Sequence, residues 1–369
     1  MPEPAPLHPV SRAHLEALSD EVGVMQHAIG SRPDPAHGYC TDDVARALEV
    51  DLLHGNELGW DAVADSAWRA MRFLEVAFDE TIGRFRNFRG VDGSWVAETA
   101  SEDSQGRAML ALGETIAAAP DAAMVDAAGS LFERALPAAR DVTFMRAQAS
   151  VVLGCDRAMV GAPSEATDAA YRLLADRLRS RFEPVASSPD WPWPEPRLTY
   201  ENARPARALI VSGRYLDDPS RVDTGLHVLD WLIASQTAHD GHLSPVGNGW
   251  WPRGGEKARF DQQPIEATAT LLAAESAHDA TGYARYREAM EQSYAWFLGA
   301  NDLGVDVADP GRGAGFDGLT PRGVNTNQGA ESTLMWLTAL EHIRSVRADG
   351  PSVPDTPSVA DQLLATSTP

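Results

Sequence analysis

The chain contains the segment Thr41-Asp42-Asp43-Val44-Ala45-Arg46-Ala47-Leu48, in which two acidic residues open an apolar helical stretch and an arginine follows one turn later. The same outline returns at 101–109, where Ser-Glu-Asp precedes Arg-Ala-Met, and at 200–209, where Tyr-Glu-Asn precedes Arg-Ala-Leu. Internal repetition of this kind is typical of proteins that are built from one repeated supersecondary unit. The three segments therefore predict that the chain repeats a helical unit.

Apolar periodicity extends this unit along the chain and predicts about twelve helices with almost no strand. Amphipathic helices with a charged face are expected at 11–29, 60–78, 121–138, 164–183, 219–236 and 281–299. Helices that are apolar nearly all round are expected at 41–54, 101–118, 143–159, 200–212, 262–278 and 327–345. The two kinds alternate strictly, and a helix that is apolar all round is buried on all sides.

Six hairpins whose second helices are buried can stack as an open solenoid or close as a ring. Closure buries both terminal faces and surrounds a ring of inner helices with a ring of outer ones. We therefore predict an all-α fold, the (α/α)6 toroid of six helical hairpins. The domain is expected to span 11–346, after an N-terminal extension at 1–10. The Pro/Ser/Thr-rich tail at 347–369 is predicted to be disordered.

The lengths of the connections predict which end of the toroid carries the function. Connections from a buried helix to the next exposed one are short. Connections into the buried helices are long, at about 30–40, 79–100, 184–199, 237–261 and 300–326, and only 139–142 is short. In an up-and-down array these long loops share one rim with the positive ends of the inner helix dipoles, and long loops in compact domains are usually functional. A short hairpin is expected within this rim at 84–95, turning at Asp92-Gly93.

Composition excludes several classes of function. The 369 residues carry 31 Lys+Arg and 53 Asp+Glu, a formal net charge of −22, which disfavours binding to nucleic acid or to an anionic membrane surface. No apolar run approaches a membrane span, no secretory signal is visible, and two cysteines without metal-type spacing fit a cytoplasmic protein. The chain has one lysine and lacks the phosphate-loop, G-x-S-x-G and H-E-x-x-H motifs, so no cofactor or metal is expected.

Carboxylates, amides and tryptophans gather in the long loops. A sugar needs such groups, because its C–H faces stack on aromatic rings and its hydroxyls bind planar amides and carboxylates. The candidate catalytic residues are Asp43, Asp103, Glu102, Asp42 and Glu266. The candidate substrate-binding residues are His37, Tyr39, Arg46, Trp95, Arg107, Glu201, Asn202, His242, Trp250, Trp251, Gln262, Gln263, Asn327, Gln328 and Glu331.

A structural interpretation stands beside the functional one. Thr41 and Ser101 are good N-cap residues, and acidic residues in the following turn are favoured there by the helix dipole. Arg46 and Arg107 lie one turn inside their helices, where they can pair with the rim acids or bind an anionic or hydroxyl-rich ligand. The pair His239 and His242 has no third strong ligand at a matching spacing, so it is expected to belong to a polar loop.

Four ordered motifs resemble a bacterial branch of the six-hairpin glycosidase superfamily. They are His37-Gly-Tyr-Cys-Thr-Asp-Asp-Val-Ala-Arg-Ala-Leu48, Ser101-Glu-Asp-Ser-Gln-Gly-Arg-Ala108, Asp261-Gln-Gln-Pro-Ile-Glu266 and Asn327-Gln-Gly-Ala-Glu-Ser-Thr333. The resemblance spans about 30–345 and implies an (α/α)6 fold, carbohydrate chemistry and an association with glycosyltransferases and mannoside phosphorylases. The branch has Asn where this chain has Val44, which implies a different subsite at that point.

We expect an inverting glycoside hydrolase that acts on oligosaccharides, with a carboxylate acid/base pair at the toroid mouth. One alternative is a sugar epimerase or isomerase on the same fold, which needs a proton-shuttling pair such as His37 and His242. The other alternative is a non-catalytic glycan-binding partner of a glycosyltransferase. Asp43→Asn and Asp103→Asn are each expected to lower the rate by several orders of magnitude if the hydrolase hypothesis holds.

Overall fold

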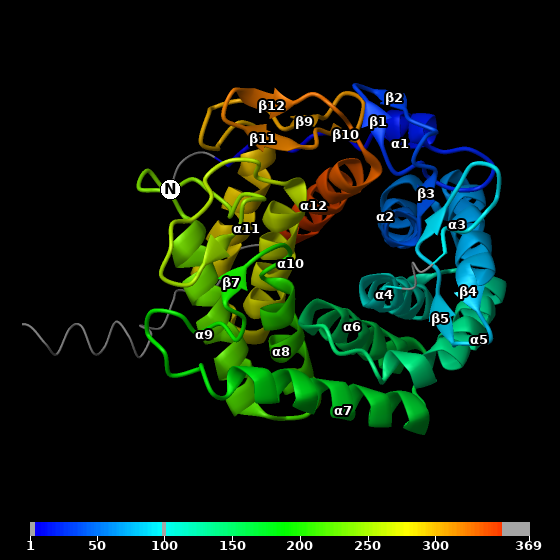
Figure 1. Ribbon diagram of the computed structural model, residues 1–369, viewed down its shortest axis with the longest axis horizontal. Helices are drawn as coiled ribbons and strands as arrows, with labels where there is room; N and C mark the ends of the chain where they lie inside the picture. The colour runs from blue at the N-terminus through cyan, green and yellow to red at the C-terminus, as the bar shows by residue number, and fades with distance from the viewer. Residues whose placement is uncertain (1–3, 98–100, 349–369) are drawn as a thin grey trace, which may run out of the picture.

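A ring of helices surrounds a second, inner ring in the computed structural model, which describes residues 4–97 and 101–348 (Figure 1). The inner helices are α2 (Thr41–Leu58), α4 (Glu102–Ala118), α6 (Met145–Gly161), α8 (Arg204–Tyr215), α10 (Pro264–Thr281) and α12 (Ala330–Ala348). The outer helices are α3 (Ala64–Ala77), α5 (Ala122–Ala139), α7 (Glu165–Phe182), α9 (Pro219–Gln236) and α11 (Ala284–Phe297). The predicted all-α toroid and its alternation of outer and inner helices are confirmed.

The first outer helix is where the structure departs most from the expected pattern. A helix was expected over 11–29, but only α1 (Ala13–Leu18) forms there. The carboxylate of Asp20 accepts hydrogen bonds from the backbone N–H groups of Val22 (2.8 Å) and Gly23 (3.2 Å), and such a local turn competes with helix formation. The chain then enters a hairpin of β1 (Ala28–Ile29) and β2 (Arg32–Pro33).

The N-terminal segment packs against the last two helices. The carbonyl of Pro6 accepts a hydrogen bond from Tyr294 on α11 (2.9 Å), and that of His8 accepts one from Arg344 on α12 (2.7 Å). At the other end of the chain, α12 continues through Arg347 and Ala348 into the predicted tail at 347–369. The rest of that tail lies outside the described residues.

Glycines allow the inner helices α4 and α6 to pack closely. A β-carbon at Gly113 would lie 2.2 Å from the carbonyl oxygen of Gly154, and one at Gly154 would lie 2.4 Å from that of Met109. No larger residue could occupy these two positions without separating the helices. The buried faces of both helices, such as Leu112 and Val151, are fully enclosed.

Short strands join the long loops at the rim. In the described part of the chain, β3 (Tyr39–Cys40) pairs with β6 (Phe88–Arg89), β7 (Arg197–Leu198) with β8 (Trp251–Pro252), and β11 (Gly318–Thr320) with β12 (Gly323–Asn325). Two further ladders join β4 (Phe78–Asp79) to β5 (Arg84–Phe85) and β9 (Ala308–Asp309) to β10 (Ala314–Gly315). Of the hairpin predicted at 84–95, only the part around the turn forms, where Arg89 pairs with Trp95; Arg84 and Phe85 pair with Phe78 and Asp79 instead.

The two predicted N-caps have different outcomes. Ser101 caps α4, because its hydroxyl oxygen accepts a hydrogen bond from the N–H of Ser104 (3.0 Å). Thr41 instead becomes the first residue of α2, and its hydroxyl donates to the carbonyl of Arg86 (2.6 Å). The prediction for Thr41 was therefore wrong: its side chain holds the segment around Arg86 against α2. Within the described residues no helix is both long enough and apolar enough to span a membrane.

Candidate active site

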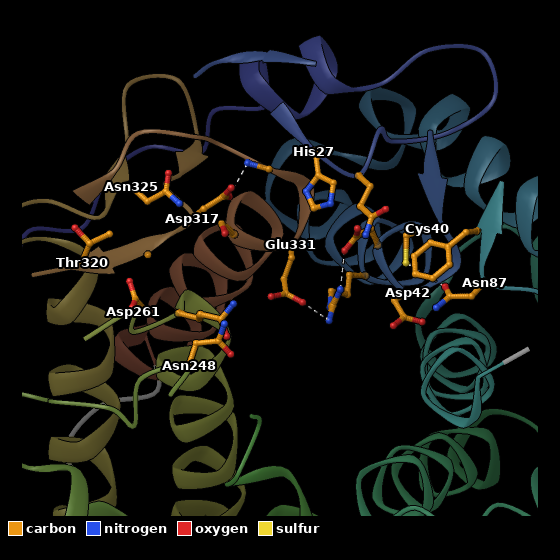
Figure 2. Close-up of a pocket in the computed structure, with 18 residues that line it drawn as sticks. His27, Cys40, Asp42, Asn87, Asn248, Asp261, Asp317, Thr320, Asn325 and Glu331 are labelled. Carbon is orange, nitrogen blue, oxygen red and sulfur yellow. Dashed lines mark hydrogen bonds and ion pairs between the residues drawn. The ribbon is translucent and has the colours of Figure 1, made fainter. Parts of the chain in front are cut away.

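A cavity of about 470 Å³ opens at the rim, where the N-terminal ends of α2 and α12 meet the loops (Figure 2). Its walls come from 26–27, 40–46, 87–88, 248–263 and 317–332, so segments from both ends of the chain meet there. The site therefore lies at the end of the toroid that the loop lengths predicted.

One arginine joins two carboxyl groups at this cavity. Arg46 donates from Nη1 to Oδ1 of Asp43 (2.6 Å) and from Nη2 to Oε2 of Glu331 (2.8 Å), as the dashed lines in Figure 2 show. Asp43 is only 3% exposed. Burial raises the pKa of Asp43 to about 7. Arg46 lowers this pKa, but its effect is weaker than that of desolvation, and the negative charge of Glu331 raises the pKa further. Asp43 can therefore hold or release a proton near neutral pH.

Asp42 occupies the neighbouring position on α2. Burial raises the pKa of Asp42, while Arg107, whose Nε lies 3.8 Å from Oδ2, and Arg46 oppose this rise. The Oδ1 atom of Asp42 is buried and has no hydrogen-bond partner among the described residues. An unpaired buried oxygen is costly, and a ligand hydroxyl at this point would satisfy it.

The wall that faces Asp42 across the cavity carries Asp261 and Asn248 (Figure 2). Asp261 has a φ of +59°, a left-handed conformation that non-glycine residues rarely adopt. The backbone N–H of Asn248 donates to the carbonyl of Asp261 (2.9 Å), which fixes these two residues beside one another. Above them, Asp317 accepts a hydrogen bond from the N–H of Gly329 (2.8 Å).

The charge of the cavity is one-sided. Its described lining includes five carboxyl groups, Asp42, Asp43, Asp261, Asp317 and Glu331, but only one arginine and no lysine. Such a field disfavours anionic ligands such as sugar phosphates and uronates. The lining also contains His27, whose ring lies edge-on to that of His37 with centroids 4.6 Å apart; burial lowers the pKa of His27, which disfavours the protonated form of its imidazole.

A second ion network lies in the described interior outside the cavity lining. Glu201 accepts hydrogen bonds from Nη2 of Arg107 (2.5 Å) and from Nε of Arg204 (2.9 Å), and all three side chains are nearly enclosed. Burial would raise the pKa of Glu201, but Arg107 and Arg204 outweigh it and lower that pKa to about 2. Glu201 is therefore a fixed negative charge that holds α4 against the start of α8.

The structure brings five of the predicted site residues into the cavity lining: Asp42, Asp43, Arg46, Gln263 and Glu331. Three of the predicted catalytic acids lie elsewhere. Glu102 accepts from the backbone N–H groups of Thr143 and Phe144, both at 2.6 Å, so it caps the start of α6. Asp103 accepts a hydrogen bond from the hydroxyl of Tyr200.

Glu266, the fifth predicted catalytic acid, is 2% exposed at the start of α10. Its Oε2 accepts from the side-chain amide of Asn202 (2.9 Å), and Asn202 also accepts from Nη2 of Arg146 (3.2 Å). Burial raises the pKa of Glu266 to about 7 against the opposing effect of Asn202. Glu266 and Asn202 are enclosed within the wall rather than at the cavity.

Most of the other predicted binding residues hold the rim together. Tyr39 donates to Asp20 (2.5 Å), Trp95 packs on Phe73 and under the guanidinium of Arg89, and Gln262 donates to Asp302 (2.6 Å). Asn327 and Gln328 bond the backbone of Gly30, and His242 lies 2.6 Å from Asp240. Trp251 is packed among other tryptophans, whereas His37 and Trp250 are exposed.

Several lining residues were not predicted as site residues from the sequence. Gln26 and His27 fall within the helix that was wrongly expected over 11–29, so nothing placed them at the rim. Asp317 and Thr320 belong to the long loop before α12, and Asp261 ends the long 237–261 loop and opens one of the four family motifs. Their loop position was the available signal, since five long loops were expected to converge.

Comparisons with known proteins support the fold. No family model matches the chain, and no curated protein matches it. Among solved structures, the chain is similar to cellobiose 2-epimerase from Spirochaeta thermophila (15% identity, TM-score 0.69, covering 91% of this chain and 93% of that one). It is also similar to a D-mannose isomerase (12% identity, TM-score 0.67, covering 90% of this chain and 94% of that one). A third similar structure is a family GH76 α-mannanase from Bacteroides thetaiotaomicron (10% identity, TM-score 0.59, covering 85% of this chain and 88% of that one). These structures share the (α/α)6 toroid, and the likeness confirms the predicted fold.

Proposed function

We propose that the protein is a glycoside hydrolase that cleaves neutral oligosaccharides with inversion at the anomeric carbon. The observation that carries this proposal is Asp43, a nearly enclosed carboxyl with a pKa of about 7 in a cavity lined by four further carboxyl groups. Glycoside hydrolysis needs one protonated and one ionised carboxyl group, and environments that separate two pKa values supply both.

In the proposed reaction, Asp43 donates its proton to the glycosidic oxygen as the bond to the anomeric carbon breaks. The carboxylate that this leaves on Asp43 is stabilised by Arg46, whose Nη1 lies 2.6 Å from Oδ1. Asp261, on the facing wall, removes a proton from a water molecule that attacks the anomeric carbon from the opposite side. Inverting enzymes need space for this water between their carboxyl groups, and an acid and a base on opposite walls would provide it.

The test is a glycan screen followed by proton NMR. Manno-, gluco- and galacto-oligosaccharides are incubated with the protein, with and without phosphate, and uronides serve as the charged control. We expect a new reducing end whose anomer is inverted relative to the substrate, and no turnover of the uronides. Cleavage that requires phosphate would indicate phosphorolysis, and retained configuration would contradict the inverting mechanism. Asp261→Asn and Asp103→Asn, compared in the same assay, decide which carboxylate activates the water.

A second candidate is a sugar epimerase or isomerase. It is favoured by the fold likeness to cellobiose 2-epimerase and D-mannose isomerase, and by the imidazole of His27 in the cavity lining, whose pKa is lowered by burial. Abstraction of a proton next to a carbonyl would be the essential step. The same NMR screen in D2O distinguishes it, because an epimerase incorporates deuterium at C2 without cleaving a glycosidic bond.

Binding without turnover would instead support a non-catalytic glycan-binding partner of a glycosyltransferase. We place any of these roles in the cytoplasm, which is supported by two buried cysteines, Cys40 and Cys155, that are both free thiols. In the screen, saturable binding of a neutral oligosaccharide with no new anomer and no deuterium uptake would select this alternative.

A further inference from the structure

Trp250 combines exposure with an unusual backbone conformation. It is 38% exposed, and its φ of +65° places a bulky residue in the left-handed region. Such conformations cost free energy and persist where the surroundings enforce them, often at ligand-binding sites. Asp261, at the other end of the same loop, has a φ of +59° and lines the cavity.

The loop that carries Trp250 is fastened to the cavity wall. The N–H of Gly247 donates to Ala258 (2.7 Å), and the N–H of Asn248 donates to Asp261 (2.9 Å). The N–H of Trp250 donates to Gly247 (2.8 Å), and the carbonyl of Trp250 accepts from Ala258 (3.1 Å). Trp250 is therefore held two residues along the chain from Asn248, which lines the cavity.

The adjacent tryptophan shows what a structural role looks like in this loop. Trp251 stacks on Trp231 with ring centroids 6.1 Å apart and an interplanar angle of 15°, and its indole N–H donates to Gly255 (3.0 Å). Trp250 has no such stacking among the described residues: the guanidinium of Arg197 lies 5.1 Å from its ring centroid, and the residue is exposed to solvent. Packing of the loop is thus explained by Trp251, whereas the exposure of Trp250 is not.

We propose that Trp250 is a stacking platform for a sugar unit that lies outside the cavity. A glycan whose reacting unit occupies the cavity would leave it past Asn248 and place a further unit on the free face of the indole. The axial C–H groups of a neutral sugar suit an aromatic face, and Arg197 on the ring fixes its orientation. This inference rests on the proposed function and adds that the substrate is an oligosaccharide, with at least one unit beyond the cavity.

The test measures binding and turnover against chain length. Cello-oligosaccharides and α-manno-oligosaccharides of one to six units are titrated by calorimetry into wild type, Trp250→Ala and Trp250→Phe. We expect Trp250→Ala to weaken binding of the longer chains about tenfold while changing that of the shortest bound sugar less than about twofold. Trp250→Phe should keep most of the affinity for long chains, because it retains an aromatic face.

Phe144 provides the matched control. It is 66% exposed at the start of α6, on the one short connection of the same rim. Phe144→Ala should leave both short and long glycans bound as in wild type. Equal losses for all chain lengths in Trp250→Ala, a length-dependent loss in Phe144→Ala, or no binding of any oligosaccharide would overturn the proposal.

The outcomes also separate this inference from the proposed hydrolysis. If the protein cleaves oligosaccharides but Trp250→Ala binds long chains as tightly as wild type, the stacking platform is rejected and the proposed hydrolase activity is kept. If affinity increases with chain length only when Trp250 is present, but no oligosaccharide is cleaved, the stacking platform is kept and the hydrolase activity is rejected.

Discussion

Two pairs of an acid and an arginine open inner helices of this toroid, and they behave in opposite ways. Asp43 pairs with Arg46 at the start of α2, and Glu201 pairs with Arg204 at the start of α8, each three residues apart. Burial is the same, since Asp43 is 3% and Glu201 is 2% exposed. Yet the pKa of Asp43 rises to about 7, and the pKa of Glu201 falls to about 2.

The difference lies in how many partners each charge has. Arg46 is shared between two carboxyl groups, Asp43 and Glu331, so neither is fully compensated. Glu201 has two arginines within hydrogen-bond distance, Arg107 and Arg204, and only the more distant carboxylate of Asp42, 3.8 Å from Arg107, competes with it. An acid followed by an arginine three residues later therefore forms a protonatable group at the cavity in one case and a permanent ion cluster in the wall in the other. The ratio of charges, and not burial alone, separates the candidate catalytic group from the structural one.

The largest effect that would test this comparison is on the rate. Asp43→Asn removes the proposed proton donor, and we expect kcat to fall by about 10³- to 10⁴-fold on an oligosaccharide, the upper range for general acid catalysis. The loss should be much smaller on a dinitrophenyl glycoside, whose leaving group needs no proton. Steady-state kinetics on both substrates measure the difference.

Glu331→Gln is the companion variant, because it leaves Asp43 alone with Arg46. The pKa of Asp43 should then fall, and the alkaline limit of the pH–rate profile should move to lower pH. Wild-type rates for Asp43→Asn on the oligosaccharide would show that Asp43 is not the acid, whatever the fate of the other carboxylates.

The next effect is on stability. Glu201→Gln leaves Arg107 and Arg204 buried without the carboxylate between them. We expect the free energy of unfolding, measured in urea, to fall by about 3 kcal/mol. Asp43→Asn should lose far less, since Arg46 keeps Glu331. Glu80→Gln, which breaks a surface pair with Arg134, is the control and should change stability by less than about 1 kcal/mol. Equal losses for Glu201→Gln and Asp43→Asn would contradict the distinction between the two pairs.

The dependence of stability on pH should also have opposite signs. Asp43 binds its proton more tightly in the folded state, because its pKa of about 7 lies above its ordinary value of 3.8. Its contribution is therefore complete below pH 4 and is lost as the pH rises to about 7. For Glu201 the folded pKa of about 2 lies below the ordinary 4.5, so its contribution is complete above pH 4.5 and is lost as the pH falls to about 2.

The measurement is the difference in unfolding free energy between wild type and each variant across pH 2 to 8. Between pH 4 and 7, the unfolding free energy of Asp43→Asn should rise relative to that of wild type, because wild type loses the contribution of protonated Asp43 over this range. The unfolding free energy of Glu201→Gln should approach that of wild type only below about pH 4.5, where wild type loses the contribution of ionised Glu201. A difference that stays constant with pH for either variant would show that folding does not shift the pKa of that carboxyl.

The sequence pattern that predicted the toroid does not distinguish these two pairs. The apolar inner helices and the long loops are local properties of the sequence, so the ring and the rim that carries the cavity followed from periodicity and loop length. Glu331, by contrast, lies 285 residues from Arg46, and no local pattern shows that they meet. His27 was missed for a different reason, because the turn at Asp20 ended a helix that the apolar pattern continued.

Glu102 is the smallest test of the comparison, and it concerns the adjacent acids in the second copy of the repeat. Its carboxylate accepts hydrogen bonds from the backbone N–H groups of Thr143 and Phe144. Both groups lie at the start of α6, where backbone donors lack helical partners. Glu102→Ala should therefore cost about 1 kcal/mol of stability, the usual value of a lost cap, and leave kcat within about twofold. Thermal unfolding and the rate on an oligosaccharide measure both effects. A large loss of rate without a loss of stability would return Glu102 to the catalytic set, and it would mean that the second copy of the repeat is a working part of the mouth rather than its support.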